Sequence, residues 1–103
     1  MHQYDICRNK NATSRKRVPY VVVLQADLLQ DFHTVVVAPI MAETIATRIS
    51  RLNPAVKIDG KTYRVSTAEL ASVLRSQLGD VVGNVQEQHR DFVGAIDLLF
   101  TGI

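Results

Sequence analysis

The residues best suited to act on another molecule lie at the carboxyl end of the sequence, where Phe100, Thr101, Gly102 and Ile103 follow an amphipathic stretch. A helix running to this point would hold an apolar tip and a terminal carboxylate at one place on the surface. Exposed apolar groups beside polar ones on a rigid element are typical of binding hot spots. The pattern therefore indicates a binding tip at 100–103, with one alternative: Phe100 and Ile103 complete the protein's own core.

Residue patterns that would indicate catalysis or metal binding are missing from the sequence. There is no cysteine pair and no His-Glu-x-x-His, and His2, His33 and His89 stand far apart. Asp27 and Asp31 could share a helix face, but two carboxylates alone make a weak cation site. We therefore predict no catalytic residue, no metal, no cofactor and no enzymatic activity, with His89 a hydrogen-bonded residue of the core.

Positive charge gathers in one early polar stretch of the chain. The cations there are Arg8, Lys10, Arg15, Lys16 and Arg17, whereas the net charge of the whole chain is only +2. That total does not indicate a sequence-specific nucleic-acid binder. The stretch is interpreted either as a solvated hairpin tip or as a docking site for an acidic segment of a partner.

Length and composition predict a single globular domain over residues 1–103. A 103-residue chain with 47% hydrophobic and 21% charged residues has enough apolar material for one core. The first residues lack the pattern of a signal peptide, and no apolar run is long enough to cross a membrane. We expect a cytoplasmic protein without a membrane partner, in which the single cysteine, Cys7, is buried and inert.

Short β-rich runs predict most of the sheet. Residues 3–8 and 20–25 are expected to form a hairpin around the basic stretch, and 35–40 a central strand that ends near Pro39. Residues 56–65 hold two alternating runs joined by Asp-Gly, a pair that suits a type I′ turn.

Helical spacing appears in three segments. By pattern alone, 41–53 and 66–78 are helices, the second opening on a capping-box match. The third runs over 84–103, with Asn84 as N-cap and Glu87 three residues later. The residues expected to face the sheet from this last helix are Val85, His89, Phe92, Val93, Ile96, Leu99 and Phe100.

The segments 95–103, 20–29, 35–40, 58–60 and 69–73 together resemble the CcdB family, toxins of bacterial toxin–antitoxin modules that poison DNA gyrase. The resemblance implies a mainly β fold, an SH3-like (CcdB/MazF-like) antiparallel barrel with one C-terminal α-helix, that forms a homodimer. It also implies that the segment 66–78 is largely extended. We prefer that expectation to the helix, because a short capping match is easily overridden by tertiary context.

The resemblance further implies that the toxin binds the A subunit of DNA gyrase and traps the cleaved gyrase–DNA complex. A cognate antitoxin is expected to fold a disordered segment onto the toxin and to cover or distort its gyrase-binding surface, with the basic stretch at Arg8, Lys10, Arg15, Lys16 and Arg17 as part of its contact. Carried onto this sequence, the gyrase-contact residues are Leu28, Leu29, Asp97, Phe100, Thr101, Gly102 and Ile103. The sequence departs from the family pattern at Thr101, where the best-known members have tryptophan.

Two alternatives stay open at this stage. Endoribonuclease toxins share a similar small barrel, and the basic stretch could follow a phosphate backbone. The chain could also be a CcdB-like relative that kept the fold but lost gyrase activity, as the departure at Thr101 suggests.

Overall fold

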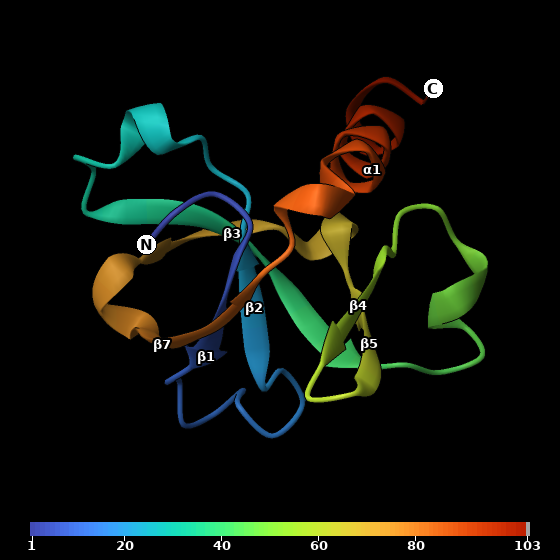
Figure 1. The fold of residues 1–103 in the computed structure, drawn as a ribbon, viewed down its shortest axis with the longest axis horizontal. Coiled ribbons are helices and arrows are strands. Elements are labelled where there is room, and N and C mark those ends of the chain that lie inside the picture. Colours follow the sequence, from blue (N-terminus) through green and yellow to red (C-terminus); the bar gives the residue numbers. More distant parts are fainter. Residues whose placement is uncertain (103) are drawn as a thin grey trace.

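The computed structural model describes residues 1–102, apart from the side chain of Ile49. Within that range the strands form one seven-stranded antiparallel sheet, curled into a half-barrel that the C-terminal helix packs against (Figure 1). The strands are β1 (Asp5–Asn9), β2 (Tyr20–Val23), β3 (Thr34–Ala42), β4 (Ala55–Ile58), β5 (Lys61–Val65), β6 (Ala71–Leu74) and β7 (Leu78–Asn84). The helix α1 spans His89–Thr101, and short 3-10 turns lie at 27–29, 47–49, 67–69, 75–77 and 86–88. The expected fold class is confirmed.

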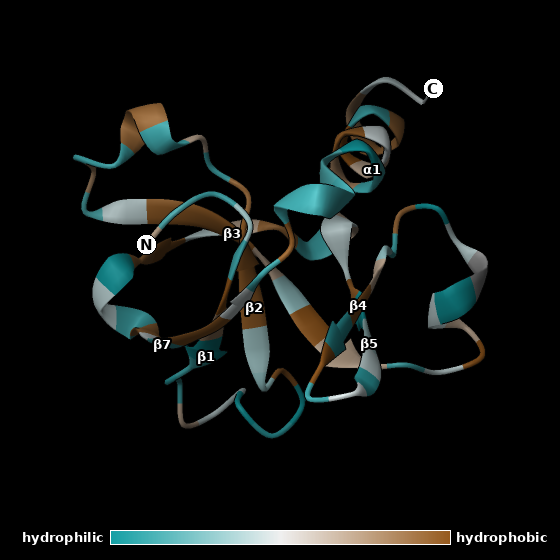
Figure 2. Cartoon of the chain, in the orientation of Figure 1, coloured by the Kyte–Doolittle hydropathy of each residue, from teal (hydrophilic) through white to brown (hydrophobic). Residues whose placement is uncertain are grey.

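The sheet runs in the order β4-β5-β3-β2-β1-β7, and β6 pairs with the first half of β3. All four residues of β2 are buried, because their side chains alternate between two hydrophobic clusters, one on each face of the sheet. Tyr20 and Val22 belong to the cluster that contains Phe92 of α1, whereas Val21 and Val23 pack with Cys7 on the other face. Figure 2 shows the hydrophobic colouring concentrated along the central strands.

The hairpin predicted over 56–65 is present, with Asp59 and Gly60 at its turn. Both turn residues have positive φ, 51° and 78°, as a type I′ turn requires. The central strand, by contrast, does not end near Pro39 but continues to Ala42. Pro39 lies between the part of β3 that pairs with β6 and the part that pairs with β5, so its missing N–H breaks no ladder.

The helix predicted over 41–53 is wrong. Met41 and Ala42 complete β3, and the chain then turns through hydrogen bonds between Thr44 and Thr47 before a single 3-10 turn. Threonine side chains that bond nearby backbone compete with helix formation. Ile45 is one of the apolar residues whose spacing suggested a helix, yet its side chain is 72% exposed and does not pack into the core.

The segment 66–78 is largely extended, as the family resemblance implied, and its helical pattern is wrong. Only 67–69 and 75–77 form 3-10 turns, while 71–74 is the strand β6. Hydrogen bonding between β6 and β3 stabilises the extended conformation of these residues and outweighs their weak local preference for a helix. None of the helices within residues 1–102 is long and apolar enough to span a membrane.

The last helix begins later than its sequence suggests. Asn84 ends β7. Its side-chain NH₂ donates to Asp5 Oδ1 and to the backbone oxygen of Gln3, and its Oδ1 accepts from the backbone N–H of Gln86, where the 3-10 turn 86–88 leads into α1. The predicted start at Asn84 is therefore wrong, because the sheet takes this residue and α1 starts at His89. The helix ends at Thr101, where Gly102 adopts φ 75° and donates its N–H to Leu98 O.

Candidate functional site

The carboxyl end of α1 presents side chains to solvent. Phe100 is 68% exposed, and Asp97, Thr101 and Gly102 are not buried either. The alternative in which Phe100 completes the core is therefore wrong. Ile103, predicted as part of the tip, lies outside the described residues.

The Thr101 hydroxyl proton is already used in a hydrogen bond within the helix. Its Oγ1 donates to the backbone oxygen of Asp97 at 2.6 Å, within the same helix. The described tip therefore exposes the apolar side chain of Phe100 and, one turn earlier in the helix, the acidic side chain of Asp97. Such a tip can bind by apolar contact and charge.

The amino end of α1 is anchored by Tyr4. The Tyr4 hydroxyl lies 2.6 Å from His89 Nδ1, and its ring stacks on Phe92 with centroids 5.3 Å apart. Burial raises the pKa of the Tyr4 phenol, so it stays protonated. His89 is hydrogen-bonded as expected but exposed, which corrects its placement in the core.

The predicted inward-facing arc is also only partly correct. Phe92 is fully buried and Ile96 packs against the core, but Val93 and Phe100 are exposed. Val85 is buried from a position before the helix begins. Ala95, which was not among the residues predicted to face the sheet, is buried in this helix, with 1% exposure.

Leu28 and Leu29 lie on the turn between β2 and β3 and are 91% and 42% exposed. This turn and the carboxyl end of α1 stand apart on the upper side of Figure 1, so a single chain does not join the two parts of the predicted gyrase surface. Around Leu29 the loop is held by Arg75, whose guanidinium donates to the backbone oxygens of Leu29 and Phe32.

Asp27 has a structural role at the start of the same turn. The backbone N–H of Gln3 donates to Asp27 Oδ1 at 2.6 Å, and this bond lowers the pKa of the Asp27 carboxyl. Asp31 is exposed. Among residues 1–102 no three metal-ligating side chains come together, so the two aspartates form no cation site of that kind.

The basic loop between β1 and β2 lies at the opposite end of the molecule from the helix tip (Figure 1). Its base is organised by Asn9, which donates to Ser14 Oγ and to the backbone oxygen of Val18. Arg17 forms an ion pair with Glu69 at 3.7 Å, and Arg8 lies over the Tyr20 ring. The remaining predicted cations of this loop, Lys10, Arg15 and Lys16, are exposed.

Cys7 is fully buried between the strands, as predicted. Burial raises the pKa of its thiol to about 11, with the Asp5 carboxylate adding to the effect. At neutral pH the thiol is therefore protonated and shielded, and it has no place in the candidate site.

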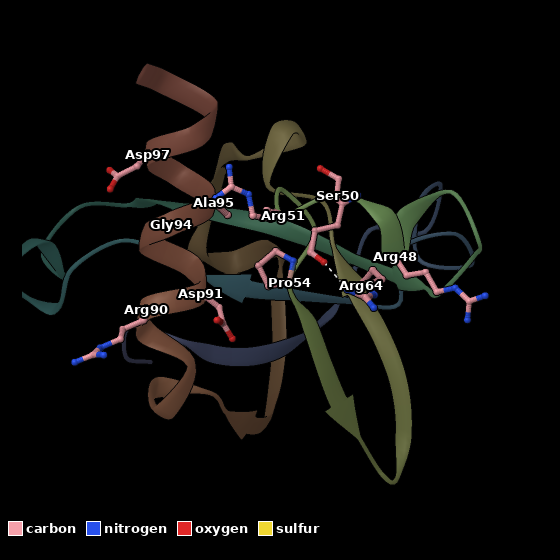
Figure 3. Close-up of a pocket in the computed structure, with 11 residues that line it drawn as sticks. Arg48, Ser50, Arg51, Pro54, Arg64, Arg90, Asp91, Gly94, Ala95 and Asp97 are labelled. Carbon is pink, nitrogen blue, oxygen red and sulfur yellow. Dashed lines mark hydrogen bonds between the residues drawn. The ribbon is translucent and has the colours of Figure 1, made fainter. Parts of the chain in front are cut away.

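A groove that the sequence did not predict lies between α1 and the segment 48–54 (Figure 3). Its volume is about 490 Å³. Its charged and small lining residues are Arg48, Arg51, Arg64, Arg90, Asp91, Asp97, Gly94 and Ala95. The one signal that could have found it is Gly94, a glycine in the middle of a helical pattern.

Comparison with known proteins agrees with this architecture. The family model described as "CcdB protein" matches residues 3–102. The fold resembles the Mycobacterium tuberculosis toxin MazF-mt6, with a TM-score of 0.77 and 19% identity over 93% of this chain and 95% of that one. It also resembles the structure described as "Crystal structure of Mtb toxin", with a TM-score of 0.70 and 20% identity over 82% and 97% of the two chains.

A third similar structure is described as "Endoribonuclease in complex with its cognate antitoxin from Mycobacterial species". Its TM-score is 0.69 at 12% identity, over 95% of this chain and 96% of that one. The fold is thus that of the small barrel toxins of toxin–antitoxin systems. Within that class the chain belongs to the CcdB family.

Proposed function

We propose that this protein is a gyrase poison that acts without catalysis, by binding the A subunit of DNA gyrase and holding the gyrase–DNA complex in its cleaved state. The observation that carries the proposal is Phe100, which is 68% exposed at the end of a helix whose other end is fixed in the core. A solvent-exposed phenylalanine on a rigid support loses little entropy on binding. Its expected target lies in the cytoplasm, and so does the protein.

The toxin acts as a homodimer in this proposal. The two exposed parts of the predicted surface, at Leu28–Leu29 and at the end of α1, stand apart on one chain. A two-fold pair presents each part twice and suits a two-fold target, in which every patch meets an identical partner. Sedimentation equilibrium tests this directly, and a monomer at micromolar concentration would contradict it.

The decisive test is incubation with purified gyrase, supercoiled DNA and ATP, followed by detergent and protease treatment that reveals trapped cleaved DNA. Wild type should give linear DNA, and Phe100→Ala should lose most of it. Ile45→Ala is the matched control, because Ile45 is similarly exposed, at 72%, on a different loop. Equal trapping by the two variants would reject the role of Phe100. If wild type traps no cleaved DNA, the alternative applies, in which the protein is a CcdB-like relative without gyrase activity.

The second candidate is an endoribonuclease, which the fold likeness to a mycobacterial endoribonuclease favours. Such an enzyme needs a general acid and a general base within reach of a ribose 2′-hydroxyl. The acidic residues that line the arginine-rich groove are Asp91 and Asp97. Incubating the pure protein with total RNA tests this candidate, since discrete fragments would displace the gyrase proposal.

The cognate antitoxin is proposed as the second partner. Family membership supports such a partner, and one protein of the same fold was solved with its own antitoxin. The exposed cations of the basic loop, Lys10, Arg15 and Lys16, are available to an acidic segment. They lie far from the helix tip, so an antitoxin held there alone would leave the tip uncovered.

A further inference from the structure

The end of the molecule opposite the tip of α1 carries a hollow of about 580 Å³ at the loop between β1 and β2 (Figure 1). Three exposed cations, Arg8, Lys10 and Arg15, line it. None of the three forms an ion pair within residues 1–102, although Asp80 shares the hollow. Three unpaired cations beside one carboxylate give the hollow a positive field.

The backbone of β1 and β7 brings two of these cations together. The register between the two strands shifts at Arg8, which alone faces the two β7 residues Gly79 and Asp80. One residue facing two is a β-bulge, and it bends β7 at this point. A Cβ built on Gly79 would lie 3.1 Å from Arg8 Cβ and 3.3 Å from Lys10 Cγ. Glycine at this position therefore lets Arg8 and Lys10 pack closely over β7.

Positive charge continues from the hollow to the hairpin of β4 and β5, which lies beside the β1–β2 loop in Figure 1. The Arg8 guanidinium lies 5.8 Å from the centre of the Tyr20 ring. The Tyr20 and Tyr63 rings pack edge to face at 5.6 Å, and the Lys61 ammonium lies 5.2 Å from the centre of the Tyr63 ring. The two tyrosines thus hold cations from two separate hairpins in one row.

The composition of this surface favours a polyanion over a protein as its ligand. The large apolar side chains that the structure exposes include none from residues 8–20 or 57–65. A protein–protein interface normally has an apolar centre, which this surface lacks. A nucleic acid needs no such centre, because much of its affinity comes from release of the counterions around its phosphates.

The two tyrosines also indicate which form of nucleic acid fits. Proteins that bind single strands stack the bases on exposed aromatic faces. Tyr20 is only 9% exposed, and Tyr63 is half-buried with a lysine over its ring. What remains accessible is the charged ends of long side chains, which contact phosphates and not bases. A duplex keeps its bases paired and presents a phosphate about every 3.4 Å along each strand.

We propose that this basic end, defined by Arg8, Lys10, Arg15 and Lys61, binds the sugar–phosphate backbone of double-stranded DNA without reading its sequence. The proposal goes beyond the proposed function and does not depend on it. Because the basic end lies opposite the tip of α1, both can be occupied at the same time. In the setting of the proposed function, the DNA would be that held by gyrase, and an acidic antitoxin segment at the basic loop would compete with it.

Fluorescence anisotropy with a labelled duplex of about 20 base pairs tests the proposal. We expect saturable binding at about 50 mM salt, with equal affinity for two duplexes of unrelated sequence. With up to four phosphate contacts, affinity should fall roughly 100-fold between about 50 and 200 mM salt, since each contact contributes about −0.9 to the slope of log affinity against log salt. Absence of binding by wild type, or binding that salt does not weaken, would overturn the proposal.

A pair of charge-matched double variants locates the binding. Arg8→Gln with Lys10→Gln should weaken binding at least tenfold and make the salt slope shallower by about 2. Arg48→Gln with Arg90→Gln is the control, because it also removes two exposed positive charges that form no ion pair among the described residues, outside the basic end. An equal loss in both double variants would mean that net charge alone drives binding, which overturns the proposal.

Asp80→Asn should change affinity in the opposite direction. Its carboxylate repels phosphates in the hollow, so its removal should tighten DNA binding several-fold, a gain that misfolding cannot produce. Asp31→Asn, at an exposed aspartate of the turn between β2 and β3, is the control and should leave affinity unchanged. Unchanged or weaker binding by Asp80→Asn would remove the hollow from the binding surface and overturn the proposal.

Other ligands are outcomes of the same assay. Equal binding of an RNA duplex of the same sequence would support recognition of the phosphate backbone. Tighter binding of single-stranded DNA, of a polyglutamate peptide or of phosphatidylglycerol vesicles, with the same dependence on Arg8 and Lys10, would overturn the assignment to duplex DNA. Gyrase trapping is scored on wild type alone. Trapping without DNA binding rejects the basic end and keeps the proposed function, whereas DNA binding without trapping does the reverse.

Discussion

Each half of α1 contains a phenylalanine, one packed in the core and the other exposed to solvent. Phe92 is fully buried and stacks on Tyr4, whereas Phe100 is 68% exposed. Eight residues of helix advance about 12 Å and rotate by about 80° relative to the starting face, which carries Phe100 beyond the strands that cover Phe92. The comparison shows that α1 is both a core element and a support that extends past the core.

This division explains how a short chain can present a rigid tip. The amino half of α1 is fixed through Tyr4, whose backbone N–H donates to Val23 O and whose carbonyl accepts from Val85 N. The carboxyl half needs no cover of its own, because hydrogen bonds continue along the helix to the Gly102 N–H. The hydrogen-bonded helix therefore holds its carboxyl end in a fixed position relative to its anchored amino end.

The largest expected effect is on the buried side of the comparison. Phe92→Ala should lower the free energy of unfolding by about 3 to 5 kcal/mol, because it removes a fully buried ring and leaves a cavity. Urea or guanidinium denaturation followed by circular dichroism measures this. A loss below about 1 kcal/mol would mean that the amino half of α1 is not part of the core.

On the exposed side, Phe100→Ala should lower affinity for the gyrase target by about 2 kcal/mol and change the free energy of unfolding by less than about 0.5 kcal/mol. Titration calorimetry and denaturation on the same variant give both numbers. If the stability loss were as large as that of Phe92→Ala, the contrast between the two phenylalanines would disappear.

The strands were more predictable than the helices, for reasons visible in particular residues. The turn at Asp59 and Gly60 needs positive φ at these two residues only, so the local sequence was enough to predict it. The helical spacing over 41–53 and the capping match at 66–69 are also local, but pairing of β3 with β5 and β6 overrides both. Non-local ladder partners do not show in a single-segment pattern.

The candidate site was predictable only in part. The exposure of Phe100 agrees with the binding tip predicted at 100–103, although the amphipathic pattern had placed Phe100 on the arc facing the sheet, and Leu28 and Leu29 were named from the family resemblance. The groove was not predicted, since it joins Arg51, Arg64 and Gly94 from three separate segments. Likewise, the Asn84 NH₂ bonds to Asp5, seventy-nine positions away in sequence, which no local rule could predict, whereas the bond from Gln86 N–H to Asn84 Oδ1 is local.

Thr101→Trp sharpens the exposed side of the comparison. The Thr101 hydroxyl bonds only to its own helix, so its replacement costs little stability. An exposed tryptophan beside Phe100 would add stacking or cation–π contact with gyrase, worth roughly 0.5 to 2 kcal/mol of affinity. Thr101→Val is the control that removes the hydroxyl without adding a ring, and a gain in affinity for valine as large as for tryptophan would reject stacking as the cause.

Tyr4→Phe tests the anchor of the buried half with the smallest change. The variant keeps the ring that stacks on Phe92 and loses only the 2.6 Å hydrogen bond to His89 Nδ1, so it should lower the free energy of unfolding by about 1 kcal/mol. In a His89→Ala background the same substitution should cost almost nothing, because its partner is already gone. Gyrase affinity should stay unchanged in Tyr4→Phe as long as the helix remains docked. A fall in affinity at full folding would show instead that the tip depends on this hydrogen bond for its orientation, and that the two ends of α1 are coupled.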